Sequence, residues 1–457
     1  MPTTRIPGPP GLPVIGSMLD LTRRPLPTYL DARRAYGDVV RFSAGPPGLR
    51  AEFYLVSSPE GAQQVLGGEA ANFRKENAFY DELRTSVGNG LLTSQDGDYL
   101  RQRRLIQPLF TRRRVDGYAD AIGIEVQALV GRWSAAPGGV VDVATEMSRF
   151  ALRAVARILF GADVEAAVEV VQRSFPVLGE FVLERGFSPV RVPRGWPTPA
   201  NRRGLRAQSD LYAVCDRIIA ERAVQARAGR PELAEPASDL LGLLAEARGE
   251  DGESLDAGEL RDQVLVFLLA GHETTATSLA FALHLLAMHP EERGRAQAEA
   301  DAVLAGRRPR AEDLDALPYV TRVVKEAMRL YPAAALLGRR AVAESVIGGH
   351  RIPAGAQVIL APWVTHRHPD HWEEPERFDP ERFLPERESG RHRYAWYPFG
   401  GGPRACIGQH FSMLESVLGL AALLTAFDFE AVDREIPLAQ GITLRADGPA
   451  RIRLAKR

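Results

Sequence analysis

One cysteine stands in a setting that suits metal binding better than core packing. The segment Phe399-Gly-Gly-Gly-Pro-Arg-Ala-Cys406-Ile-Gly408 surrounds it with glycines and sets an arginine two positions before it. An apolar run that predicts a helix begins near Ile407. A thiolate just ahead of a helix is stabilised by unpaired backbone N–H groups and by the positive end of the helix dipole. Cys406 is therefore predicted to bind a metal; the alternative is a buried structural cysteine on a glycine-rich loop.

The pattern F-x-x-G-x-R-x-C-x-G over residues 399–408 resembles, at every fixed position, the haem-binding signature of the cytochrome P450 family. The resemblance implies that Cys406 is the axial thiolate ligand of the iron of haem b, a ligand that favours cleavage of an O–O bond. It also implies that Arg404 pairs with a haem propionate and that Phe399 shields the sulfur. Gly402 and Gly408 would let the backbone turn tightly and approach the porphyrin.

A second constellation, Ala270-Gly271-His-Glu273-Thr274-Thr, places a carboxylic acid beside a hydroxyl. Such a pair can pass protons into a dry pocket, although the threonines could simply bond to backbone groups inside a helix. The segment resembles the A-G-x-[DE]-T-[ST] motif of the same family. The resemblance implies that Glu273 supplies protons, that Thr274 donates them at oxygen, and that Ala270 and Gly271 lie against the haem. Gly271 is expected to leave room for dioxygen.

Three further positions are expected to bind the haem propionates because they resemble family contacts. Tyr99 and Arg103 match W-x-x-x-R with tyrosine in place of tryptophan, and Arg340 fits a third contact, with its neighbour Arg339 as the alternative. A solvated surface charge is the other interpretation of each arginine.

The pair Glu326 and Arg329, three residues apart, shares one helix face and would by itself be a common surface ion pair. With Arg382 it resembles the family's Glu–Arg–Arg triad. That resemblance implies a buried network that supports the cysteine loop and takes no part in catalysis.

Long helices and a small β region are predicted to position these residues. Apolar residues at three- and four-residue spacing predict helices over most of 98–330, and Ser58-Pro59 predicts a helix start. A long loop is expected over 186–204. The β elements expected are a hairpin from Val39–Phe42 and Phe53–Val56, a turn between short strands at 348–355, and a closing hairpin over Thr443–Leu454 that turns at Asp447-Gly448.

The predicted fold class is mainly α with a minor β region. By resemblance it is a single-domain cytochrome P450 fold, with haem between a long distal helix and a proximal cysteine loop. Residues 1–20 are interpreted as a proline-rich N-terminal segment and residues 21–457 as the haem domain.

Composition sets limits on location and partners. The chain has 457 residues, 45% hydrophobic and 25% charged, with a formal net charge of −1, which argues against a nucleic-acid binder. Two cysteines make no disulfide framework, and Cys215 is expected in the core. The apolar run Val264–Met288 could span a bilayer, but Glu273 at its middle favours a buried helix of a soluble protein. With no membrane anchor or signal at the N-terminus, a cytoplasmic monomer is expected.

The resemblance implies a monooxygenase that inserts one oxygen atom from O2 into a hydrophobic small molecule. No flavin- or nicotinamide-binding segment is visible, so we expect a separate electron donor, a ferredoxin or flavodoxin with an NAD(P)H reductase. A basic cluster would attract an acidic donor, unless it is only a solvated helix face: Arg101, Arg104, Arg112, Arg113 and Arg114.

Five mostly apolar segments are placed at the substrate by resemblance: 79–92, 175–187, 266–270, 333–337 and 442–443. They favour a bulky hydrophobic substrate in specialised metabolism, a terpenoid or a polyketide or macrolide, while a fatty acid stays open. Two alternatives remain. One is a peroxide-driven or non-oxygenating member of the family that acts as an isomerase, dehydratase or ring-forming catalyst; the other is a non-catalytic haem-thiolate sensor.

Overall fold

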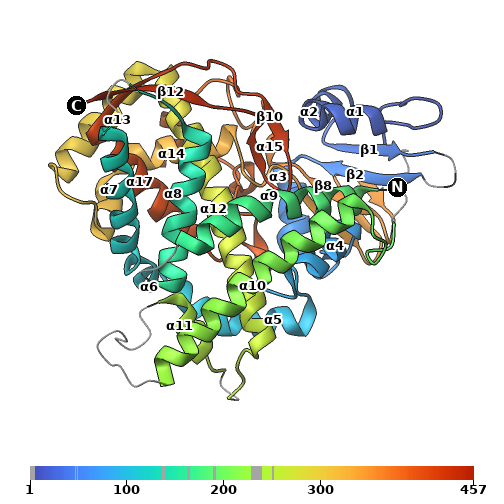
Figure 1. Cartoon of the computed structure of the whole chain (residues 1–457). Helices are drawn as coiled ribbons and strands as arrows, with labels where there is room; N and C mark the ends of the chain where they lie inside the picture. Colours follow the sequence, from blue (N-terminus) through green and yellow to red (C-terminus); the bar gives the residue numbers. More distant parts are fainter. Residues whose placement is uncertain are drawn as a thin grey trace.

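Helix α12 (Ala257–Met288) runs through the middle of the computed structural model (Figure 1). The structure describes residues 6–46, 48, 50–135, 139–161, 165–188, 192–227, 239–249 and 252–457. Asp256 caps the start of α12 through the backbone N–H of Glu259, whose side chain accepts from the backbone of Asp256. Its most apolar 18-residue window has a mean hydropathy of 1.4 and is 78% buried inside the protein. The helix is long and apolar enough to span a membrane, but here it forms the core.

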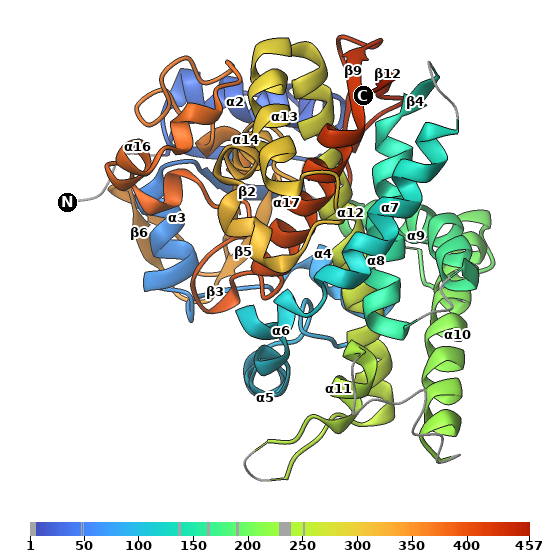
Figure 2. The same ribbon diagram turned by 90° about the vertical axis from the view of Figure 1, so that its left-hand side faces the viewer.

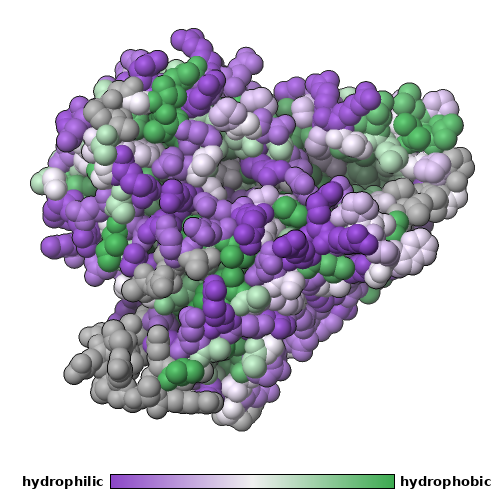
Figure 3. All heavy atoms as spheres, viewed as in Figure 1, coloured by the Kyte–Doolittle hydropathy of each residue, from purple (hydrophilic) through white to green (hydrophobic). Residues whose placement is uncertain are grey.

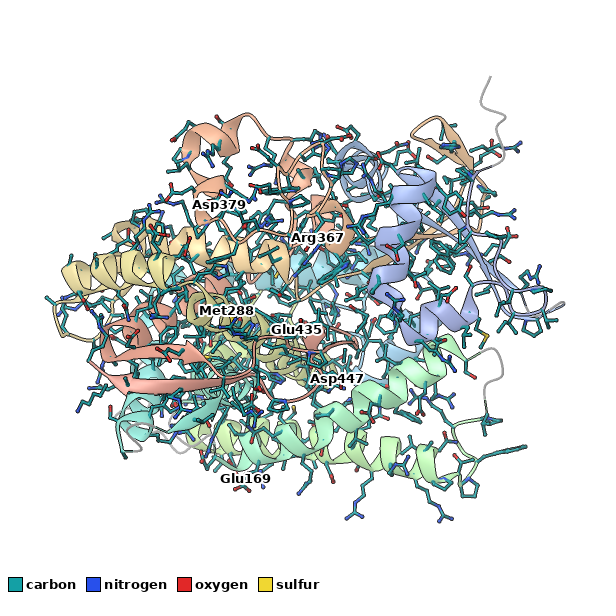
Figure 4. The ribbon with its side chains drawn as sticks, turned by 90° about the horizontal axis from the view of Figure 1, so that it is seen from above. Glu169, Met288, Arg367, Asp379, Glu435 and Asp447 are labelled. Carbon is teal, nitrogen blue, oxygen red and sulfur yellow. The ribbon has the colours of Figure 1, made fainter. Side chains whose placement is uncertain are left out.

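The helices packed most extensively against α12 are α8 (Val143–Phe160), α14 (Pro318–Leu330) and α17 (Gln409–Ala426). Two long helices, α9 (Glu165–Phe187) and α10 (Pro199–Arg227), pack against each other along one edge (Figure 4). The remaining α-helices are α1 (Met18–Arg23), α2 (Pro25–Tyr36), α3 (Pro59–Gln63), α4 (Ala78–Val87), α5 (Asp96–Ile106), α6 (Arg112–Asp116), α7 (Ala119–Ser134), α11 (Leu240–Glu246), α13 (Pro290–Leu304), α15 (Pro362–Thr365) and α16 (Pro385–Ser389). Figure 2 shows α5 and α6 below the sheet region and next to the helical part.

Beside the helical part lies a five-stranded sheet, with its strands in the order β1-β2-β8-β5-β3. Its strands are β1 (Val39–Ala44), β2 (Ala51–Val56), β8 (Gln357–Leu360), β5 (Leu337–Ala341) and β3 (Phe73–Arg74). Only β2 and β8 pair in parallel. The expected first hairpin is confirmed, with Val39 opposite Val56. The turn expected over 348–355 is shorter: it lies at residues 348–349, between the paired strands β6 (Ser345–Ile347) and β7 (His350–Ile352), so β7 falls inside the expected range.

The expected closing hairpin over Thr443–Leu454 is wrong. Strand β11 (Leu444–Ala446) pairs with the strand before it in the chain, β10 (Leu438–Gln440). Strand β12 (Arg451–Lys456) pairs instead with β9 (Phe427–Ala431) and β4 (Val140–Asp142). The turn that joins two paired strands lies at 441–443. Pro449 has no N–H to donate, and the Asp142 carboxylate holds the N–H of Ala450, which steers the chain away from β11.

Two other expectations need adjustment. Helix α9 continues to Phe187 and α10 begins at Pro199, so the expected loop over 186–204 is shorter. The proline-rich N-terminal segment, described from residue 6, is bound to the sheet, since the carbonyl of Pro7 accepts the N–H of Arg41 at 2.8 Å. Cys215 is fully buried in α10, as expected. The fold is mainly α with a minor β region, as the sequence predicted.

Candidate active site

A cavity of about 320 Å³ lies between α12 and the cysteine loop, residues 399–408. One wall carries Ala270, Gly271 and Thr274 of α12, and the opposite wall carries Phe399, Arg404, Cys406 and Gly408. Segments far apart in the sequence therefore face each other across one space. That arrangement is the one expected of a flat cofactor held between a distal helix and a proximal loop.

The cysteine loop holds its sulfur at the cavity through a tight backbone path. The N–H of Cys406 donates to the carbonyl of Phe399 at 2.9 Å. Gly402 has φ +64°, and a Cβ there would lie 1.7 Å from the carbonyl oxygen of Leu66, so only glycine fits. Gly408 has φ −87° and precedes α17. A Cβ on Gly408 would lie in ordinary contact with Cys406 Sγ, at 4.0 Å, so neither φ nor space at this position requires glycine.

The Cys406 side chain is accessible from the cavity, although protein surrounds it on its other sides. Burial raises the pKa of the Cys406 thiol, while the N–H of Gly408 and the charges of Arg103 and Lys75 act in the opposite direction. The expected stabilisation by the helix start is therefore present but outweighed by burial. A metal cation at the sulfur would release the proton, as for other coordinating thiols.

Four cations line the same cavity: Lys75, Arg103, Arg339 and Arg404. The Lys75 ammonium donates to the carbonyl of Leu92 at 3.0 Å, and burial holds its pKa well below the ordinary value. Arg404 has a buried Nη1 without a partner among the described residues, and burial lowers its pKa to about 10. None of the four pairs with a carboxylate in the described part of the chain, so this end of the cavity fits the two propionates of a haem. No sequence motif marks Lys75, which the sequence reasoning missed.

Of the two neighbouring arginines offered for the third propionate contact, Arg339 lines the cavity and Arg340 does not. Arg339 is 5% exposed and lines the cavity, whereas Arg340 is exposed on the other face of β5. Successive residues of a strand point to opposite faces, so only one of the pair can reach the cavity. Arg340 faces solvent.

Tyr99 and Arg103 line the cavity and also hold the cysteine loop. The Tyr99 hydroxyl donates to the carbonyl of Pro403 at 2.6 Å, and the Arg404 guanidinium lies 3.5 Å from the centre of its ring. Arg103 Nη1 donates to the carbonyl of Ala405 at 3.0 Å. The hydroxyl proton of Tyr99 is therefore used inside the loop, so Tyr99 does not present it to a propionate.

On the opposite wall, the Thr274 hydroxyl donates to the carbonyl of Ala270 at 2.8 Å, the back-bond expected from the sequence. Such a side-chain bond to the backbone can bend or open a helix, but α12 stays continuous at Thr274. A Cβ on Gly271 would lie 3.1 Å from Val155 of α8. The glycine thus allows α8 and α12 to approach closely; because Gly271 also lines the cavity, the expectation that it leaves room for dioxygen stays a prediction.

Glu273 does not face the cavity of Cys406. Its carboxylate accepts from the Thr443 hydroxyl at 2.5 Å and lines a second cavity of about 490 Å³ on another side of α12, with His272 and Arg445. Burial raises the pKa of Glu273, while Thr443 and Arg445 act to lower it. Burial also lowers the pKa of His272 to about 4, so this imidazole is neutral near pH 7. The structure thus separates the acid from the neighbouring hydroxyl, a placement that spacing alone did not show.

The proximal network was correctly predicted. Arg329 binds Glu326 through two nitrogens at 2.7 and 2.8 Å, and both side chains are 0% exposed. Arg382 Nε lies 3.4 Å from Glu326 Oε1. Arg329 also donates to the carbonyls of His366 and Pro375 at 2.9 and 2.6 Å, which fixes the segment before the cysteine loop.

Most of the remaining cavity wall is apolar, with hydroxyl groups from Thr275, Ser278 and Ser412 among the exceptions. It includes Leu91, Leu92, Val266, Phe267, Ala333, Ala334 and Leu337. Three of the five segments expected at the substrate therefore lie there. The other two differ: Phe175 of α9 lines the second cavity, and neither Ile442 nor Thr443 lines the cavity of Cys406.

Comparisons with known proteins agree with this geometry. The family model of cytochrome P450 matches residues 6–449. Cyclooctat-9-en-7-ol 5-monooxygenase of Streptomyces melanosporofaciens is 36% identical, over 94% of this chain and 91% of that protein. Pentalenene oxygenase of Streptomyces avermitilis is 36% identical, over 91% and 89%. The crystal structure of the cytochrome P450DA heme domain superposes with a TM-score of 0.87 at 28% identity, covering 99% of this chain and 98% of that one.

Proposed function

The chain belongs to the cytochrome P450 family, and we propose that it inserts an oxygen atom from O2 into a C–H bond of a terpenoid hydrocarbon or alcohol. It is a P450 monooxygenase with a haem-iron cofactor and a hydrophobic substrate. The proposed substrate class rests on the composition of the cavity wall, in which four cationic side chains are set among mostly apolar ones. All four cations that line the cavity fit the propionates of the cofactor, and no other charged side chain among the described residues lines it.

A substrate with a carboxylate would need a cation of its own in a buried pocket. The lining offers none to spare, so a fatty acid fits poorly, whereas an uncharged polycyclic compound fits the aliphatic and aromatic wall. The printed names of two relatives, pentalenene oxygenase and cyclooctat-9-en-7-ol 5-monooxygenase, support a terpenoid over a polyketide or macrolide.

We assign the cofactor as haem b, held by Cys406 at the iron and by Lys75, Arg103, Arg339 and Arg404 at the propionates. When bound, the haem supplies the activation of dioxygen. Phe399 supports the loop that carries the sulfur, because its carbonyl accepts the N–H of Cys406.

Although their side chains line different cavities, we assign the proton supply to both Glu273, as the source, and Thr274, as the donor at oxygen. The raised pKa of Glu273 makes its carboxyl a proton carrier closer to neutral pH than an ordinary glutamate. The second cavity gives this carboxyl a polar surrounding outside the haem cavity, and Thr274 presents its hydroxyl oxygen inside the haem cavity. The chain's part in the reaction is to hold the proton at Glu273 until it is needed.

Electrons come from a separate protein. We propose an acidic ferredoxin or flavodoxin with an NAD(P)H reductase, and a cytoplasmic monomer as the working form. Three arginines of the basic cluster support this, because Arg104, Arg113 and Arg114 are exposed and have no ion-pair partner in the described ranges. The other two are engaged: Arg101 binds Glu259, and Arg112 binds Asp315 at 2.6 Å.

The substrate class is tested by a spectral binding screen on the holoenzyme, followed by turnover with a ferredoxin system. Cyclic terpene hydrocarbons and their alcohols should shift the haem absorbance and yield oxygenated products, whereas long-chain fatty acids should do neither. Tight binding and turnover of a fatty acid would contradict the proposal. Product formed with peroxide but not with electrons and O2 would instead favour the peroxide-driven alternative.

A further inference from the structure

The second cavity, which Glu273 lines, has the size of a small-molecule site. Its volume is about 490 Å³, against about 320 Å³ for the cavity of Cys406. Sites for small ligands measure roughly 300–1,000 Å³. No described residue lines both cavities, so α12 separates two distinct spaces. Helices α8, α9 and α12 and the segment 436–450 supply the walls of the second one, and Figure 1 shows the three helices meeting near the middle of the molecule.

The second cavity is open to solvent. Thr145 of α8 and Gln172 and Pro176 of α9 line it and are exposed, so a compound can enter it without passing the cavity of Cys406. The side of the molecule seen in Figure 3 is mostly hydrophilic, and its described hydrophobic residues form small, separate areas. Surfaces that dock other proteins usually present larger apolar patches. The opening therefore suits a small molecule better than a partner protein.

Part of the lining is apolar and can hold a hydrocarbon skeleton. Val171 and Phe175 contribute from α9, and Ala276 and Ala280 contribute from α12. The ring of Phe175 meets the imidazole of His272 edge-on, with centroids 5.3 Å apart. Burial of an apolar ligand against these side chains is favourable in proportion to the area removed from water.

The charged groups of the lining are already engaged. The Asp142 carboxylate accepts from two backbone N–H groups at 2.9 and 3.1 Å and from the Thr145 hydroxyl at 2.6 Å. His272 donates to a backbone carbonyl at 2.8 Å and is neutral near pH 7, because burial lowers its pKa to about 4. The Arg445 side chain is 42% exposed and lies 3.9 Å from Glu180. Within the described lining, a charged ligand therefore finds no unpaired counter-charge in the interior.

Two hydrogen-bonding groups remain for an uncharged ligand. Pro176 lies inside α9 and has no N–H, so the carbonyl of Gln172, one turn earlier, lacks its usual helical partner. Both residues line the cavity, which puts a backbone acceptor on the α9 wall. On the α12 wall, Thr443 takes one of the two carboxyl oxygens of Glu273, at 2.5 Å. Burial raises the pKa of Glu273 and so disfavours a full negative charge there.

We propose that the second cavity binds a neutral, hydroxylated apolar compound of the terpenoid-alcohol class. Its skeleton packs against Phe175, Ala276 and Ala280, and its hydroxyl donates to the carbonyl of Gln172. Oxygenation of a hydrocarbon yields a compound of this class. The inference rests on the lining of the second cavity, however, and it holds whether or not the proposed reaction is correct.

The test is equilibrium dialysis of the holoenzyme against compounds that share one bicyclic skeleton. Borneol carries a hydroxyl, bornane has no polar group, bornylamine is a cation and camphorsulfonate is an anion. The measurements are made in Ala334→Phe, in which an added ring fills part of the cavity of Cys406, as well as in the wild type. In both proteins, borneol should bind at least about tenfold more tightly than either charged compound, because a charge in the second cavity has no partner.

Two further variants locate the bound borneol. Ala276→Phe, the counterpart of Ala334→Phe on the other side of α12, places its ring in the second cavity and should abolish the binding that Ala334→Phe retains. Pro176→Ala gives α9 an N–H for the carbonyl of Gln172. It should weaken borneol binding about fivefold, the worth of one net hydrogen bond. Bornane has no hydroxyl and should bind Pro176→Ala as it binds the wild type.

Borneol binding that is absent, that persists in Ala276→Phe or that is lost only in Ala334→Phe would overturn the proposal. Tighter binding of camphorsulfonate or bornylamine would overturn the neutral ligand class, and unchanged borneol affinity in Pro176→Ala would refute the bond to Gln172. Circular dichroism and haem content establish that each variant is folded. If Ala276→Phe does not fold, the comparison of borneol with bornane in Pro176→Ala decides, and dialysis needs no turnover.

Discussion

Removal of the Glu326 carboxylate should destabilise this protein far more than removal of a surface carboxylate with the same spacing to an arginine. In Glu326→Ala the Arg329 guanidinium loses both of its bonds to carboxylate, at 2.7 and 2.8 Å, while it stays fully buried. A buried charge left without its counter-ion costs about 3–5 kcal/mol. The backbone N–H of Asp379, which donates to Glu326 at 3.0 Å, loses its acceptor as well.

Urea unfolding of the holoprotein, followed by the haem absorbance and by circular dichroism, measures this cost. Asp31→Ala is the control, because Asp31 and Arg34 are also three residues apart in a helix, yet their side chains are 65% and 59% exposed. The control should lose less than about 1 kcal/mol. Glu326→Gln, which keeps the shape and an acceptor for Asp379, should fall between them. If Glu326→Ala lost no more than Asp31→Ala, the proximal network would not support the cysteine loop as argued.

Four further outcomes are expected. Gly402→Ala should prevent haem incorporation because its Cβ would meet the Leu66 carbonyl at 1.7 Å. Gly400→Ala is the control: Gly400 also has a positive φ but nothing within 4 Å, so this variant should retain haem and lose about 1–2 kcal/mol of unfolding free energy. Equal haem content in the two variants would refute this prediction. Lys75→Met should speed haem loss to an acceptor protein yet stabilise the apoprotein against urea, because a buried cation is removed; slower haem loss would contradict the assignment. Thr274→Ala should lower product formed per electron consumed and release peroxide, and unchanged coupling would remove Thr274 from the proton supply. The pKa of Glu273 is raised above 4.5 in the folded state, so the free energy of unfolding should fall as pH rises from 4.5 through the folded-state pKa. Glu273→Gln should flatten this decline in urea unfolding measured against pH. An unaltered slope would refute the raised pKa of Glu273.

Sequence reasoning worked where chemistry and spacing are local. The cysteine loop, the long buried helix and the Glu326–Arg329 pair each follow from residues close together in the chain, and all three lie where they were expected. The hairpin after Thr443 failed because an Asp-Gly pair predicts a turn but does not choose the partner strand. That choice depended on the contact between Ala450 and Asp142, more than 300 residues apart.

The missed and shifted site residues have the same origin. Lys75 directly follows the edge strand β3 and lines the cavity, and no local pattern marks it. The choice between Arg339 and Arg340 needed the pairing of β5 with β8, which decides the face that each residue occupies. The reason for Gly271 became visible only when Val155 of α8 was placed against it. Contacts between distant segments determine each of these roles.

The central claim is that the Cys406 sulfur is the iron ligand. The carbon monoxide spectrum of the reduced holoprotein tests it most directly. The wild type should show the long-wavelength Soret band of a thiolate-ligated haem, and Cys406→His should show the shorter-wavelength band of a histidine-ligated haem, with circular dichroism unchanged. A Soret band that stays at the wild-type position in Cys406→His would contradict the account.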